Sequence, residues 1–243
     1  MENAVTAGLA RQIVLARALD VTANNIANQT TAGFKADHIE FREYLARLQD
    51  GASGDPFVSL VYDPDSYTDF SSGGFEPTYN DLDFAIEGGG FFSVETESGV
   101  RYTRDGRFTM NDAGELVTRS GARVLDAGGA PILVDPEAGP LVLSNDGALQ
   151  QQGSDIATLG VFRFDDLSAL AKRGDNLFEA ASQPDSVAQP RIRQGFVETS
   201  NVVPVVAITD MIEIMRAYEQ AAQLIETSND LSRETVRTLS EPA

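Results

Sequence analysis

The chain has 243 residues, enough for one large domain or two small ones, and 42% of them are hydrophobic, as in ordinary globular proteins. It contains no cysteine, which excludes disulfides and thiolate metal sites. Its formal net charge of −19 argues against a nucleic-acid partner, because such partners require basic patches.

The first residues do not resemble a secretory signal peptide. Glu2 stands where a basic region is expected, and Arg11 and Arg17 interrupt any apolar run. No window approaches the ~18 consecutive apolar residues of a spanning helix. We therefore expect no direct membrane insertion and no cleaved signal peptide.

Glycine and proline divide the chain into three parts. Residues 36–195 contain 19 of the 21 glycines and 8 of the 10 prolines, so the flanks are predicted to be helical and the middle to be strands and turns. We expect an N-terminal helix in residues 1–35, an irregular or β connector in residues 36–80, a β-rich domain in residues 81–190, and a return strand with a C-terminal helix in residues 191–243.

The N-terminal helix has an apolar seam of mostly small residues, in which Gln12 is the one polar member. Small residues at 3–4 spacing suit a close approach between helices. The seam consists of Val5, Leu9, Ala16, Leu19, Ala23 and Ile26.

The middle of the chain alternates short apolar runs with turn signals. Asp105-Gly106 predicts a tight hairpin, and Asn111 to Gly114 and Ser120-Gly121 follow at hairpin intervals. The sequence DPDSYTD at 63–69 is predicted to be a turn.

The C-terminal segment repeats the seam pattern. Ser200 or Asn201 is expected to cap this helix, and Pro204 is expected in its first turn, where a missing N–H does no harm. The seam consists of Ile208, Met211, Met215, Tyr218, Ala222 and Ile225.

These patterns together predict an α+β fold, in which N- and C-terminal helices flank a central all-β domain of short antiparallel strands. Two arrangements of the helices stay open. They could fold against their own domain, or they could pair as a coiled coil that exposes further seams to neighbouring chains.

No catalytic, cofactor-binding or metal-binding residue is predicted. His38 is the only histidine, which excludes histidine-rich zinc sites and Cys–His pairs. EGGGFF at 87–92 leads into a predicted strand instead of a helix, so it is not a phosphate-binding loop. Paired carboxylates remain possible by composition, which leaves a periplasmic carboxylate-dependent hydrolase as an alternative.

Four stretches resemble the flagellar axial proteins, the rod and hook family of the bacterial flagellum. Asn24 to Asn28 followed by Thr31, Gly33, Phe34 and Lys35 resembles the N-terminal signature of that family. SNVVPVVAITDMIEIMRAYE at 200–219 resembles its C-terminal signature, and residues 83–92 and 102–121 resemble its β region. Within the family, the first 28 residues look most like the proximal-rod members.

The resemblance implies a structural subunit of the proximal rod, which polymerises helically into the drive shaft that crosses the periplasm and transmits torque. Its partners would be itself, other rod proteins on the MS-ring and export-gate side and on the distal side, and the flagellar type III export apparatus. The terminal helices would pair as an inner coiled-coil layer. A distal-rod or hook subunit is the alternative within the family.

The polar end of the N-terminal helix fits an assembly role. Asn24 and Asn28 lie one turn apart, and buried polar groups in a seam fix register. Gly33 is expected to end the helix or turn the loop, and Phe34 to anchor the turn on apolar surface. With the two seams, these four residues form the expected assembly interface.

Overall fold

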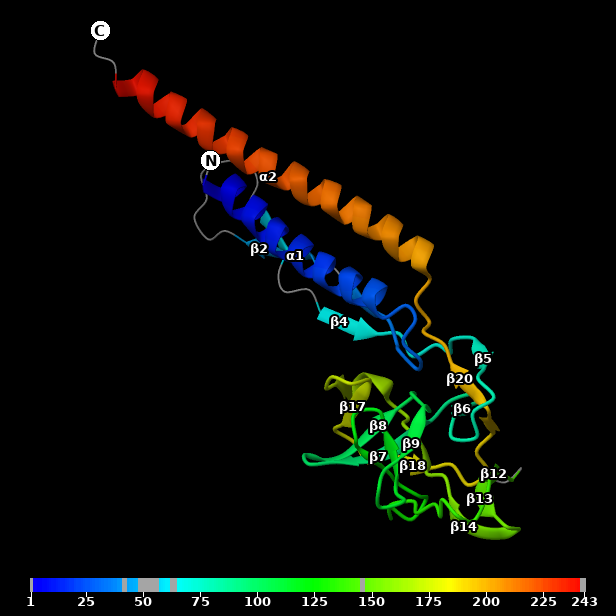
Figure 1. Cartoon of the computed structure of the whole chain (residues 1–243). Helices are drawn as coiled ribbons and strands as arrows, with labels where there is room; N and C mark the ends of the chain where they lie inside the picture. Colours follow the sequence, from blue (N-terminus) through cyan, green and yellow to red (C-terminus); the bar gives the residue numbers. More distant parts are fainter. Residues whose placement is uncertain (1, 41–42, 48–56, 62–64, 145–146, 241–243) are drawn as a thin grey trace. The chain divides into compact units, whose positions relative to one another are not determined.

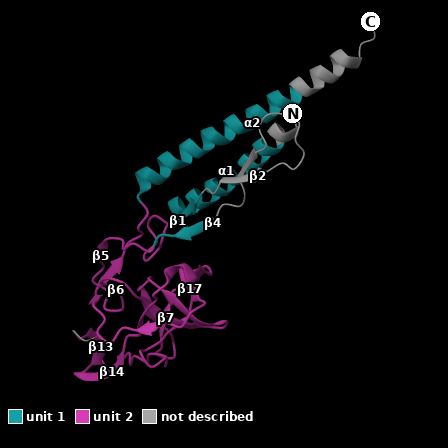
Figure 2. Cartoon of the chain, turned by 180° about the vertical axis from the view of Figure 1, so that it is seen from behind, with its two compact units in different colours: residues 1–27, 37–69, 203–243 teal, residues 28–36, 70–202 magenta. Residues whose placement is uncertain are grey.

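The computed structural model describes residues 2–40, 43–47, 57–61, 65–144 and 147–240, and the side chains of residues 6–40, 66–144 and 147–230. The chain splits into two compact units (Figure 2): unit 1 contains residues 1–27, 37–69 and 203–243, and unit 2 contains residues 28–36 and 70–202. The divisions expected at residues 35, 80 and 190 fall inside unit 2. The reason is strand pairing within unit 2, where β5 (Phe75–Pro77) pairs with β20 (Phe196–Glu198) and β6 (Phe84–Ile86) pairs with β19 (Ile192–Gln194).

Unit 1 is built on two helices, α1 (Glu2–Ala27) and α2 (Pro204–Ser240), which lie side by side and antiparallel (Figure 1). Two antiparallel strand pairs accompany them: β1 (Asp37–Glu40) with β4 (Asp65–Thr68), and β2 (Glu43–Arg47) with β3 (Phe57–Val61). The prediction of a turn at residues 63–69 was wrong for the part that is described, because residues 65–68 extend to pair with β1. Residues 63 and 64 lie outside the described residues.

The two helices of unit 1 bury different amounts of side chain. On α1, which packs against α2, β1 and β3, Val14, Leu15 and Ala18 are buried. On α2, Ala221 is the one buried side chain of the described range 204–230. A Cβ on Gly8 would lie 2.8 Å from Cγ1 of Ile225, so this glycine allows the helices to approach closely.

Pro204 lies in the first turn of α2, as predicted, and the helix begins at this residue, because proline fits the first helical position. The predicted cap was wrong. Ser200 Oγ accepts a hydrogen bond from Val202 N, and Asn201 Oδ1 accepts one from Ala36 N. The carbonyl of Val203 accepts the first helical hydrogen bond, from Ala207 N.

Unit 2 contains one large antiparallel sheet with the strand order β16-β17-β8-β7-β11-β10-β9, in which β15 also pairs with β7 and β18. A smaller sheet has the order β12-β13-β14. Besides β5, β6, β19 and β20, the strands are β7 (Phe91–Thr96), β8 (Gly99–Thr103), β9 (Phe108–Met110), β10 (Leu116–Thr118), β11 (Arg123–Val124), β12 (Val142–Leu143), β13 (Ala148–Gln151), β14 (Ser154–Thr158), β15 (Val161–Arg163), β16 (Leu170–Lys172), β17 (Leu177–Ala180) and β18 (Asp185–Ser186), with a short 3₁₀ turn η1 (Leu167–Ala169). The α+β class predicted from the sequence is therefore confirmed.

Two of the predicted hairpins are present and one is not. Asn111 to Gly114 joins the paired strands β9 and β10, and Ser120-Gly121 joins β10 and β11. The hairpin prediction for Asp105-Gly106 was wrong, because β8 and β9 are not partners. Gly106 is needed for a different reason: a Cβ there would lie 1.7 Å from the carbonyl oxygen of Phe84.

The core of unit 2 lies on both faces of the large sheet. One cluster is centred on Phe84, Phe92 and Phe108. The other is aromatic, with Phe91 and Phe178 meeting edge to face at 5.7 Å. This core fixes the strands that carry the polar network of unit 2.

Gly106→Ala is expected to lower the free energy of unfolding of unit 2 by about 1–3 kcal/mol, because the methyl group overlaps the Phe84 carbonyl. Gly89→Ala is the matched control: its methyl group would meet Arg163 Cδ at 3.9 Å, an ordinary contact. Urea unfolding of both variants measures the difference. Equal midpoints would contradict the account of Gly106.

Candidate assembly site

One face of α2 carries a row of apolar side chains that remain about half exposed or more in the described structure. Val205, Ile208, Ile212 and Met215 follow one another at spacings of 3, 4 and 3, and each is between 45% and 75% exposed. This spacing places them on one side of the helix. We call these four residues the outer row of α2.

A second row on α2 is turned toward α1. Met211, Ala222 and Ile225 are half-buried, and Ala221 is buried between them. Through the half-buried Ile214 and Ala217, this row runs from Met211 by Ala221 to Ile225 at spacings of 3, 3, 4 and 4, so α2 presents two neighbouring apolar rows. Only one of them is covered within unit 1.

Helix α1 also leaves apolar side chains in solvent. Leu9 and Ile13, one turn apart, are 53% and 64% exposed. Arg11 and Arg17 are exposed on the same helix. Contiguous exposed apolar side chains are the kind of surface at which proteins bind one another.

The residues of the expected assembly interface are placed differently by the structure. Leu9, Ala23, Asn24, Ile208, Met215 and Tyr218 are exposed, whereas Ala16, Leu19, Ile26, Asn28, Met211, Ala222 and Ile225 are half-buried. Gly33 and Phe34 are buried in unit 2. The side chain of Val5 lies outside the described residues.

Asn25, which sequence reasoning passed over, is the buried asparagine of α1. Its Nδ2 donates to the Asp37 carbonyl at 2.7 Å, and its Oδ1 accepts from Asp37 N at 3.0 Å. Thr68 Oγ1 donates to the Asp37 carboxylate at 2.6 Å, so β1 and β4 are tied to the same point. The helical period from the buried Val14 and Ala18 leads to position 25, and this signal could have found it.

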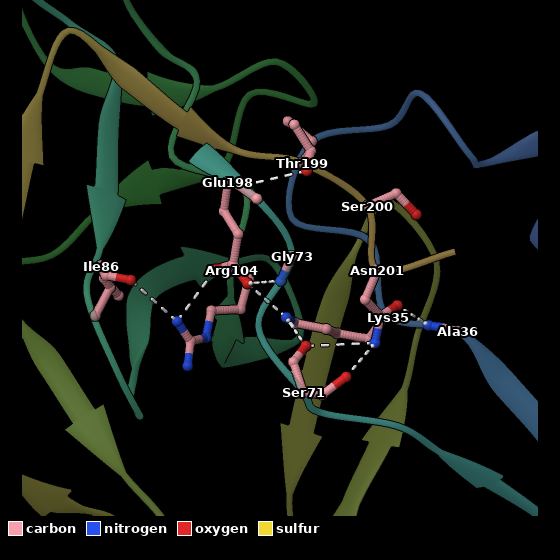
Figure 3. A network of polar contacts seen from close by, with 12 residues as sticks. Lys35, Ala36, Ser71, Gly73, Ile86, Arg104, Glu198, Thr199, Ser200 and Asn201 are labelled. Carbon is pink, nitrogen blue, oxygen red and sulfur yellow. Dashed lines mark hydrogen bonds and ion pairs between the residues drawn. The ribbon is translucent and has the colours of Figure 1, made fainter. Parts of the chain in front are cut away.

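Unit 2 contains a buried ion network around Glu198 (Figure 3). Glu198 Oε1 accepts from Lys35 Nζ at 2.6 Å and from Gly73 N at 3.0 Å, and Oε2 accepts from Arg104 Nη1 at 3.1 Å. The side chains of Lys35, Glu198 and Arg104 are 0%, 1% and 4% exposed. One carboxylate therefore holds two cations that come from distant parts of the chain.

The motif Gly33-Phe34-Lys35 is built into this network. Gly33 N donates to the Glu198 carbonyl at 2.7 Å. Gly33 has a φ of +68°, and a Cβ there would lie 2.4 Å from the Arg104 backbone, so only glycine fits. Because α1 ends at Ala27, Gly33 turns the loop and does not end the helix.

Further contacts hold the same loop. Lys172 Nζ lies 4.4 Å from the centre of the Phe34 ring and donates to the Lys35 carbonyl. Asn176 Nδ2 donates to the Ala32 carbonyl at 3.0 Å. Phe34 therefore packs under a cation, and the loop is held at each residue from 32 to 36.

The charged groups of the network stabilise one another. Burial lowers the pKa of the Arg104 guanidinium, and the neighbouring Glu198 carboxylate opposes that effect. The two carboxyl groups with a resolved shift, Glu179 and Asp166, have a lowered pKa, because Arg173 and Ser168 donate hydrogen bonds to them.

A cavity of about 670 Å³ in unit 2 is lined by the carboxylates Glu95, Glu97 and Asp175 among other residues. Glu95 pairs at 2.8 Å with Arg123, which also lines the cavity. His38 stacks on Tyr67 at the exposed strand pair of unit 1.

Within the described ranges, no group of three or more potential ligands could hold a metal ion. In the same ranges, no helix combines the length and the apolar character that crossing a bilayer requires.

Glu198→Gln is expected to lower the free energy of unfolding of unit 2 by about 3–5 kcal/mol, because it leaves Lys35 and Arg104 buried without their shared anion. Glu179→Gln is the matched control. Glu179 also pairs with two arginines, Arg101 and Arg173, but it is 35% exposed, so its loss should change stability little. Urea unfolding decides, and similar losses in the two variants would refute the network's role.

Three family models match the chain in separate segments. The family "Flagella basal body rod protein" matches residues 2–35. "Flagellar hook protein FlgE/F/G D1 domain" matches residues 85–151, and "Flagellar basal body rod FlgEFG protein C-terminal" matches residues 193–238.

Relatives match over almost the whole length. The flagellar basal-body rod protein FlgF of Caulobacter vibrioides is 44% identical over 241 residues, with 98% of each chain covered. FlgF of Mesorhizobium japonicum is 37% identical, again with 98% of each chain covered. The rod protein FlgG of Bacillus subtilis is 30% identical and covers 90% of this chain and 92% of its own.

Proposed function

The chain belongs to the family of flagellar basal-body rod proteins, as a structural subunit and not an enzyme, and we propose that it assembles through the uncovered apolar rows of α1 and α2. The family membership confirms the resemblance expected from the terminal motifs. It also supports assembly with other rod proteins.

The outer row of α2 is the observation that carries this proposal. Its four side chains are on average about half covered, so burying the rest of them contributes on the order of 4 kcal/mol to a contact with a neighbour. A helix that is covered on one side only is expected to complete its packing elsewhere. The rows at 3–4 spacing suit coiled-coil packing, in which α1 and α2 join the helices of neighbouring subunits in an inner layer of the rod.

The charges of the two helices favour a contact between α1 of one subunit and α2 of another. Over its whole length α1 carries two arginines and two carboxylates and is neutral. Over its whole length α2 carries three arginines and six carboxylates, so two copies of α2 would repel each other. A contact between two different faces is heterologous, and such contacts build open helical assemblies instead of closed dimers.

Within the rod we propose the proximal position, since the identity to the FlgF relatives is higher than to FlgG of Bacillus subtilis. In this proposal the neighbours lie toward the MS ring and export gate on one side and toward the distal rod on the other. The flagellar type III apparatus exports the subunit, and the finished rod crosses the periplasm and transmits torque. The position of the chain in purified basal bodies separates this proposal from a distal-rod or hook subunit.

Ile212→Glu is expected to leave the isolated chain folded but to abolish its retention in basal bodies, because it puts a charge in the middle of the outer row. The control Gln220→Glu adds the same charge at an exposed polar position of α2, about a quarter of a turn from Ile212. Each variant replaces the native copy in a motile host, and immunoblots of detergent-purified basal bodies measure retention. Normal retention of the Ile212 variant would contradict the proposal.

A further inference from the structure

Tyr79 of unit 2 combines a strained backbone with an exposed ring. Its φ is +58°, in the left-handed region, and 88% of its surface is exposed. The other described non-glycine residues with positive φ are Gln152, Asp175 and Asn176. Aspartate and asparagine tolerate this conformation, whereas for a bulky aromatic residue it is unusual.

The backbone at Tyr79 is held firmly in place. The carbonyl of Gly195 accepts hydrogen bonds from both Thr78 N, at 2.8 Å, and Tyr79 N, at 3.2 Å. Asn80 N donates to Thr78 Oγ1, and Gln194 Nε2 donates to the Asp81 carbonyl. Such a network keeps a strained residue in a single conformation.

Among the residues that the structure describes, the ring of Tyr79 makes no packing contact that would offset the strain. A buried ring would offset the strain by packing, but this ring lies almost wholly in solvent. A glycine would adopt the same φ without strain. Strained residues that a rigid frame presents to solvent are found where a protein binds a partner.

The surroundings of Tyr79 are acidic. Glu76 and Asp81, three residues before it and two after it, are exposed. The nearby cation, Arg193, stacks on Phe196 at 4.2 Å and pairs with Glu87 at 3.3 Å, so it is already engaged. The site is therefore suited to receive a positive charge.

We propose that Tyr79 is the anchor of a second contact site, on unit 2, for a different rod protein that places an arginine or lysine over the exposed ring. Tyrosine is enriched among the residues that dominate binding energy, because its ring is large and rigid, and a cation over an aromatic face is attracted to it. A second copy of this chain fits poorly, since its net charge is −19 and like charges would meet at this site. The proposal rests on membership of the rod for the source of the partner, but not on the helix rows.

Four variants separate the ring from the strain. Tyr79→Gly removes both, Tyr79→Ala removes the ring and keeps the strain, and Tyr79→Phe keeps the ring. Gln152→Gly is the matched control, because Gln152 is exposed with a φ of +49° in the turn between β13 and β14, so this change relieves strain elsewhere. Urea unfolding of the isolated chains measures stability, and immunoblots of purified basal bodies measure retention.

Tyr79→Gly and Gln152→Gly are both expected to unfold at the wild-type urea midpoint or above it. Retention of Tyr79→Gly and Tyr79→Ala should fall about tenfold, whereas Tyr79→Phe and Gln152→Gly should stay close to wild type. A variant that is more stable yet assembles less cannot be explained by damage to the fold.

Three results would overturn the proposal. Wild-type retention of Tyr79→Gly would show that the ring binds nothing in the rod. Loss of the Tyr79→Phe variant from basal bodies would assign the contact to the hydroxyl group and would contradict a cation over the ring. Self-association of the isolated wild-type chain in sedimentation, lost in Tyr79→Gly, would identify a second copy as the occupant. Failure of the wild-type chain itself to be retained would overturn the proposed rod function, which separates the two failures.

Discussion

The carboxylate of Glu198 is the interaction on which the arrangement of unit 2 depends. It binds Lys35 and Arg104 and accepts from Gly73 N, and so four stretches of chain, including its own, meet around one buried charge. Three of the four, residues 28–36, 70–74 and 198–202, continue directly into unit 1. Because a buried carboxylate is stable only when it is paired, the network holds these stretches together or fails as a whole. The points where the chain leaves unit 2 are thereby fixed.

The two helices have the opposite character. They bury few side chains within the chain, and α2 contributes Ala221 alone to the core of the part that is described. The glycine at position 8 brings them close, but a close pair of helices covers only one side of each. A structural subunit of a rod benefits from this division: the β unit has its own buried core, and incomplete helices keep their remaining apolar surface for neighbours.

The sequence predicted the helices and strands well, but it did not predict which residues contact one another in the fold. Helical periodicity predicted both helices. It did not show which face of α2 is buried, because a row through positions 208, 211 and 215 and a row through positions 205, 208 and 212 have the same spacing. Gly33-Phe34-Lys35 was recognised as a motif, yet Lys35 finds its partner 163 residues away, which no local pattern shows. Asp105-Gly106 has hairpin chemistry but serves close packing against Phe84. Tyr79 left no signal, because its φ depends on the distant Gly195 carbonyl.

The absence of cysteine makes the most direct measurement of the central claim possible, since a single introduced thiol is the sole target of a maleimide. Ile212→Cys should be labelled rapidly in the isolated chain, where the outer row is exposed, and should be protected in purified basal bodies. Gln220→Cys, off the row, gives the reference rate in each sample. The account predicts that the labelling rate in the isolated chain, divided by the rate in basal bodies, is much larger for Ile212→Cys than for Gln220→Cys. Equal labelling of Cys at position 212 in both samples would contradict it.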